Sequence, residues 1–188
     1  MLNFCDDNLK LKIGKGYFMK KYLKYSGIVA VLFAIVSFIL MMATSGVMYQ
    51  SGSTQYNYEG ILVLFGGTRS GLYGLVSVTF KPAAISLIAW ILVLVAIIII
   101  LLGIILPLLK VKALDKFAGV LNLIAVAALI TGGILLFFSA PAFYGANKDV
   151  VSESVRLNVG WVFAGILAIV GGCFAILPAA VDFVGKKK

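Results

Sequence analysis

Histidine is absent from this chain, cysteine occurs only twice, and charged side chains are few. Charged residues make up 12% of the 188 positions and hydrophobic residues 62%, against roughly 25% and 45–50% in a typical soluble domain. The lack of histidine excludes a histidine-based catalytic triad and leaves too few ligands for a zinc or haem site. Since no other cluster of catalytic side chains occurs, the sequence predicts no catalytic, cofactor or metal site and no enzyme.

Four apolar runs occupy most of the chain, at about 25–47, 82–106, 117–138 and 159–177. None of them contains Asp, Glu, Lys or Arg. A hydrocarbon core about 30 Å thick is crossed by about 20 helical residues. A soluble protein of this size buries only about 70% of its surface and would leave these runs exposed to water. We therefore expect an all-α membrane protein, with four transmembrane helices forming one bundle over residues 25–184.

The distribution of basic residues predicts the orientation of this bundle. All but four of the 16 Lys and Arg residues lie in the N-terminal tail 1–24, in the loop after the second run, or in the C-terminal tail 185–188. Basic residues near helix ends stay on the cytoplasmic side. We expect both termini to be cytoplasmic in a multi-pass cell-membrane protein, with loops 48–81 and 139–158 facing outward. The net charge of +9 then favours anionic lipid as a partner rather than nucleic acid.

This orientation also bears on the two cysteines. Cys5 is then cytoplasmic, and Cys173 lies near the cytoplasmic end of the fourth helix. Disulfides do not persist in that compartment. We expect both thiols to stay free.

The start of the chain allows two interpretations. Met19-Lys20-Lys21 followed by an apolar run is typical of a bacterial start, and Lys15-Gly16 can be encoded by a ribosome-binding sequence. Residues 1–18 are then a misread leader. In the alternative, they belong to a true basic tail on the membrane. The first run is longer than the 7–15 apolar residues of a signal peptide, so we expect an uncleaved anchor.

Small residues at helical spacing predict where the helices meet. Lipid is as apolar as leucine, so membrane helices associate through close packing. The fourth run carries a stripe at four-residue spacing, and the second run carries small residues seven apart. The stripe either packs within one bundle or docks a partner subunit. These candidate packing residues are Gly160, Ala164, Ala168, Gly172, Ala89, Ala96 and Gly103.

The first outward loop is expected to form a small β-hairpin. Gly60–Phe65 reads as a strand, 66–71 as a turn, and Leu72–Phe80 as a second strand ending in alternating β-formers. Arg69 at the turn is either solvated or a contact for an acidic partner. Tyr73 is a further candidate contact in this loop.

Two resemblances follow from short motifs in this loop. Gly71-Leu72-Tyr73 stands where claudin-like tetraspan membrane proteins have Gly-Leu-Trp, and the four crossings with a β-rich first loop are similar to that family. The paired loop cysteines of that family are absent. The Phe65-Gly66 pair before the second helix resembles small four-helix membrane proteins of Gram-positive and wall-less bacteria. That second resemblance implies no particular activity.

We therefore expect a non-enzymatic membrane scaffold or accessory subunit that binds another membrane or surface protein. The alternative is a channel or transporter component acting as a homo-oligomer, with a pore lined by Ser37, Ser86 or Asn122. Ion-coupled transporters usually carry ionisable groups inside their helices, and the four runs have none. The acids Glu59, Asp149 and Glu153 stand isolated in the loops, so an enzyme is the least favoured class.

Overall fold

Four long helices dominate the structure, a computed structural model that describes residues 25–51, 53–70, 77–108, 112–151 and 155–184. They are Tyr25–Ala43, α3 (Ala84–Leu108), α4 (Lys112–Phe137) and α6 (Val159–Val184). All four are long and apolar enough to cross a membrane. The predicted four apolar helices are thus confirmed, and they indicate a multi-pass membrane protein.

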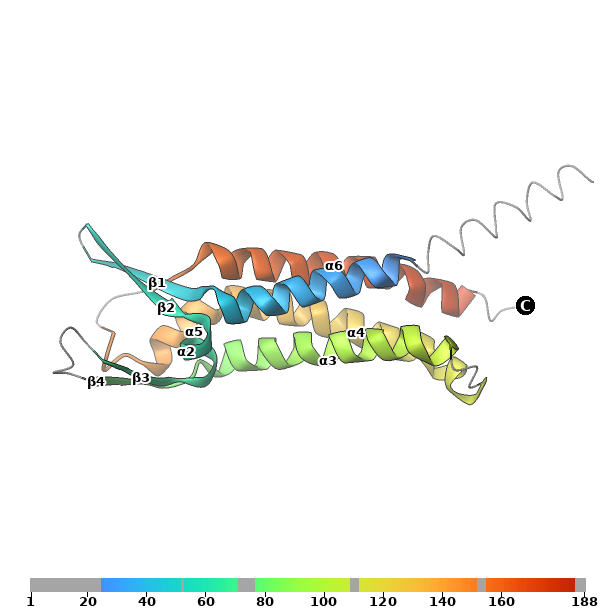
Figure 1. Cartoon of the computed structure of the whole chain (residues 1–188), viewed down its shortest axis with the longest axis horizontal. Helices are drawn as coiled ribbons and strands as arrows, with labels where there is room; N and C mark the ends of the chain where they lie inside the picture. Colours follow the sequence, from blue (N-terminus) through green and yellow to red (C-terminus); the bar gives the residue numbers. More distant parts are fainter. Residues whose placement is uncertain (1–24, 52, 71–76, 109–111, 152–154, 185–188) are drawn as a thin grey trace, which may run out of the picture.

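The helices lie along the long axis of the molecule, and every other helix and strand of the described residues lies at one end, on the left of Figure 1. We call this the sheet-bearing end. It holds five strands and two short helices, in the order β1 (Ser45–Ser51), β2 (Thr54–Glu59), α2 (Gly60–Phe65), β3 (Gly67–Ser70), β4 (Ser77–Phe80), α5 (Ser139–Ala146) and β5 (Arg156–Leu157).

The first helix ends earlier than predicted, at Ala43 instead of position 47. The Thr44 hydroxyl donates to the Leu40 carbonyl at 2.6 Å, and Ser45 and Gly46 then begin strand β1. Ser and Gly disfavour the interior of a helix. The apolar residues Val47 and Met48 belong to the strand, and sequence alone could not separate them from the helix because both elements are apolar.

The other helix ends also differ from the predicted limits. Helix α6 continues through Pro178 to Val184, beyond the predicted limit at position 177. A proline inside a helix removes one backbone hydrogen bond and clashes with the preceding turn. Ala179 and Ala180, the best helix formers, follow it and support the last turns.

The predicted hairpin was wrong in its first strand and in its turn. Gly60–Phe65 forms helix α2, and positions 67–70 of the expected turn form strand β3, which pairs antiparallel with β4. A six-residue apolar run does not distinguish strand from helix. Tertiary contacts favour the helix here, because Gly60 donates to the Thr44 carbonyl at 3.0 Å. A Cβ at Gly60 would collide with the backbone of Met41.

A second hairpin, β1–β2, was not predicted at all. It belongs to a three-stranded antiparallel sheet with the order β2-β1-β5. Strand β5 comes from the loop before α6 and pairs with β1 at Val47↔Leu157 and Met48↔Arg156. The two loops at this end of the bundle therefore build one sheet together.

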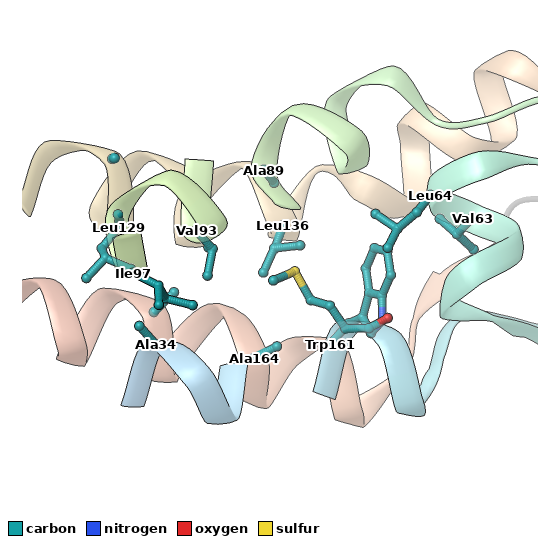
Figure 2. Close-up of a cluster of buried hydrophobic side chains, with 14 of the residues drawn as sticks. Ala34, Val63, Leu64, Ala89, Val93, Ile97, Leu129, Leu136, Trp161 and Ala164 are labelled. Carbon is teal, nitrogen blue, oxygen red and sulfur yellow. The ribbon is translucent and has the colours of Figure 1, made fainter. Parts of the chain in front are cut away.

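The core is continuous from the helices into the sheet-bearing end. Figure 2 shows Trp161 of α6, Leu136 of α4 and Leu64 of α2 converging at this junction. All three are fully buried. The indole N–H of Trp161 donates to the Met41 carbonyl at 3.2 Å, which satisfies a carbonyl near the end of the first helix.

Candidate interaction surface

The small-residue stripe of α6 faces the interior of the bundle. A Cβ at Gly160 would collide with the side chain of Thr44, and one at Gly172 would come within 2.7 Å of a side chain of α4. Ala164 and Ala168 have no exposed surface. All four stripe residues therefore lie against other parts of the same chain, which leaves other faces of α6 for any partner subunit.

The small residues of α3 are placed in the same way. Ala89 and Ala96 are fully buried, and a Cβ at Gly132 of α4 would come within 3.2 Å of the Ala89 carbonyl oxygen. A Cβ at Gly103 would come within 2.8 Å of the Asn122 side-chain oxygen. Ala89 and Gly103 therefore lie against the neighbouring helix α4, and Ala96 lies inside the bundle.

The polar residues that were candidates for lining a pore lie inside the bundle. Ser37 donates to the Ala164 carbonyl at 2.7 Å. Ser86 is fully buried, and Asn122 is 9% exposed. A pore formed between copies of the chain would be lined by outward-facing residues, so these three side chains would not line it.

An aromatic cluster joins three elements of the sheet-bearing end. The ring of Tyr58 on β2 lies 5.3 Å from that of Phe80 on β4 and 5.2 Å from that of Phe143 on α5, centroid to centroid. The rings of Phe80 and Phe143 are 6.0 Å apart. Aromatic pairs at such distances add about 0.5–1.5 kcal/mol each beyond their burial. Both hairpins are thereby fixed to the bundle.

A buried asparagine forms a second connection, which the sequence did not reveal. The Asn147 side chain accepts from the Lys81 N–H at 2.7 Å and donates to the Lys81 and Phe143 carbonyls at 3.0 and 2.9 Å. Asn147 is only 2% exposed. It links the end of α5 to the segment that enters α3. No sequence signal distinguished it from other loop asparagines.

Strand β2 is the exposed edge of the three-stranded sheet. Five of its six residues are exposed. Tyr56 is 49% exposed and stacks on Tyr49 of β1 at 5.7 Å between ring centroids. In Figure 1 the β1–β2 hairpin projects beyond the ends of the helices. Strand β2 thus presents a polar surface that includes an exposed tyrosine.

Arg69 lies beside this edge. It was expected in a turn, but it belongs to β3 and pairs with Val78. Its guanidinium donates to the backbone carbonyl of Asn57 at 2.9 Å, so it links the two hairpins. Tyr73, the other candidate contact, lies outside the described residues.

The environment of the Tyr58 hydroxyl depends partly on the same arginine. Burial raises the pKa of Tyr58 above its ordinary value, and the positive charge of Arg69 lowers it in part. The charge of Tyr49 adds a smaller upward effect. The two hairpins are therefore coupled electrostatically as well as by contact.

In the part of the chain that the structure describes, no group of three or more His, Cys, Asp or Glu residues could hold a metal ion. Cys173 is an exposed free cysteine on α6. Cys5 and Glu153 lie outside the described residues.

The four apolar helices and the strands at one end define a class, a multi-pass helical protein with a compact β-structure at one end. No protein-family model matches the chain, and the search for curated relatives found none.

Proposed function

We propose that this protein is a non-enzymatic membrane scaffold or accessory subunit, and that its sheet-bearing end binds another membrane or surface protein. The four apolar helices anchor it in the cell membrane, with both termini in the cytoplasm. Anionic lipid contacts its basic cytoplasmic segments. The sheet-bearing end then faces outward, where a partner can reach it.

One observation supports this proposal above all: the two loops of the sheet-bearing end build one structure, joined by strand pairing and side-chain hydrogen bonds. Strand β5 of the second loop pairs with β1 of the first, and Asn147 joins α5 to the segment before α3. Loops that only connect helices do not require such fixation. A preorganised surface binds with less loss of conformational entropy.

The two resemblances found in the sequence support the same proposal. Four helices with a β-rich first loop are shared with claudin-like tetraspan proteins. The Phe65-Gly66 pair supports a bacterial source. Here Phe65 ends α2, and Gly66 follows it with a φ of 70°, a conformation that favours glycine. These resemblances favour a small membrane protein that is exposed at the cell surface, and they indicate no specific partner.

Site-specific photocrosslinking in native membranes tests the proposed binding. A photoreactive residue at Tyr56, on the exposed edge strand, should yield a discrete adduct with another protein. The matched control is Ile98 of α3, which is also half-exposed but lies on an apolar helix, where lipid is expected. If the two positions gave the same adducts, or if Tyr56 gave none, the proposal would be wrong.

Chemical labelling of intact cells tests the proposed orientation. An amine reagent that cannot cross the membrane should label Lys81 and Lys148, which are both exposed at the sheet-bearing end. It should not label Lys110 or Lys186 until the membrane is opened. The reverse pattern would place the sheet in the cytoplasm and contradict the proposed localisation.

A further inference from the structure

We propose that the outer edge of β2 binds an extended peptide segment of another protein by adding it as a further strand in exchange for the Arg69 contact at Asn57, and that Arg69 selects segments carrying an acidic residue. This inference rests on the proposed function and specifies the chemistry of the partner. It follows from the register of β2, from the composition of its edge, and from the position of one guanidinium group.

The register shows which backbone groups of β2 face outward. Strand β2 pairs with β1 without interruption from Val47↔Tyr58 to Ser51↔Thr54. In an antiparallel pair, residues alternate between bonding the neighbouring strand and pointing away from it. The Asn57 carbonyl is bonded to Arg69 of β3, so Asn57 is in an outward-pointing position. Gln55, two residues earlier, points the same way.

Apart from the Arg69 contact at Asn57, the edge lacks the usual protection against strand addition. Natural proteins block exposed edges with proline, lysine or a bulge. The segment Thr54–Glu59 contains neither proline nor lysine, and the only irregularity of its pairing lies between Ser45 and Val47, at the base. A regular edge of this kind is the surface that β-strand addition requires.

Arg69 supplies the selectivity. Its N–H occupies the place at the Asn57 carbonyl that an incoming backbone N–H would take. In the described ranges no carboxylate forms an ion pair with this guanidinium. A neutral strand would displace Arg69 without replacing its hydrogen bond. A strand with an acidic residue opposite Asn57 gives the guanidinium a carboxylate, which forms a stronger, charge-assisted bond.

A pair of capped peptides tests the proposal on the full-length protein in lipid nanodiscs. The probe is Thr-Val-Thr-Asp-Thr-Val-Thr, and its counterpart has Asn in place of Asp. Binding is followed through the backbone amide signals of Gln55 and Asn57. The Asp peptide should bind about tenfold more tightly, the lower end of what a charge-assisted hydrogen bond provides.

Three changes separate edge binding and charge selection from general attraction. Arg69→Glu should abolish the preference for Asp and favour a peptide with Lys at the same place. Arg156→Glu is the matched control, because it makes the same charge change on β5 at the opposite side of the sheet. Gln55→Pro should abolish binding, since it removes an outward N–H from an edge strand, where proline is tolerated.

A modified peptide tests strand addition even if the Gln55→Pro variant fails to fold. Methylating alternate backbone nitrogens of the Asp peptide blocks strand addition and leaves the protein unchanged, and it should abolish binding. Equal affinity of the Asp and Asn peptides, equal effects of Arg69→Glu and Arg156→Glu, or no binding of either peptide at millimolar concentration would each overturn the proposal. Adducts at Tyr56 alongside such results would leave the proposed function intact.

Discussion

Gly133 of α4 and Gly165 of α6 face each other so closely that a side chain at either position would crowd the backbone of the other helix. A Cβ at Gly133 would lie 2.8 Å from the Gly165 carbonyl oxygen, and a Cβ at Gly165 would lie 3.1 Å from the Gly133 carbonyl oxygen. The contact is reciprocal and involves backbone atoms, which cannot move without shifting a helix. It fixes the distance between α4 and α6.

Gly133→Ala should therefore destabilise the bundle. The added methyl group would overlap the backbone of α6, and overpacking of this kind costs about 1–3 kcal/mol. The free energy of unfolding in mixed detergent micelles measures the effect. Gly145→Ala in α5 is the control, because a Cβ there meets nothing within 4 Å. Equal stability of the two variants would show that the backbone contact is not tight.

Gly172→Leu separates the two interpretations of the α6 stripe. The new side chain would collide with Ile130 of α4, where a Cβ alone comes within 2.7 Å. We expect a lower free energy of unfolding that does not depend on protein concentration. Ile166→Leu, at a half-exposed position of α6, should have little effect. Loss of assembly with unchanged stability would instead indicate that the stripe binds a partner subunit.

Asn147→Ala should loosen the attachment of α5. The change removes the acceptor at 2.7 Å from the partly buried Lys81 N–H, and a polar group left unsatisfied when buried costs about 1–3 kcal/mol, so a part-buried one should cost about 1 kcal/mol. Hydrogen exchange at the Lys81 amide should become faster, while exchange in the middle of α4 stays slow. Asn158→Ala, at a longer and exposed side-chain contact of 3.5 Å, is the control. Unchanged exchange at Lys81 would contradict the role of Asn147.

The stability of the sheet-bearing end should fall at alkaline pH because of Tyr58. Burial raises the pKa of Tyr58 in the folded protein, so the unfolded state loses this proton first, near pH 10. Stability from this group is complete below that pH and is lost as the pH rises through the folded pKa. Tyr58→Phe should reduce the loss of stability at alkaline pH, and Tyr56→Phe on the same strand should leave that loss unchanged. Thermal unfolding as a function of pH measures both variants.

Length and polarity were enough to predict the four helices. Runs without charge, of the length that crosses a bilayer, have few alternative structures. The small residues of α6 and α3 were recognisable as packing positions because a helical repeat puts them on one face. The sequence could not predict whether that face packs against the same chain or against a partner subunit, because small residues serve both kinds of contact.

The sheet-bearing end was predicted less well, for a physical reason. Its elements depend on contacts between segments far apart in the sequence. Strand β1 needs β5, more than a hundred residues away, and α2 is positioned by bonds to Thr44 and Ala83. Asn147 acts through the backbone of Lys81. None of these partners has a local sequence signal.

The connections between the sheet and the helices are also very short. Thr44 is the single residue between the first helix and β1, and Asn158 is the single residue between β5 and α6. Two adjacent strands are thus direct continuations of two adjacent helices. The orientation of the sheet is therefore tied to the tilt of both helices, and neither helix could tilt independently without changing the pairing of β1 with β5.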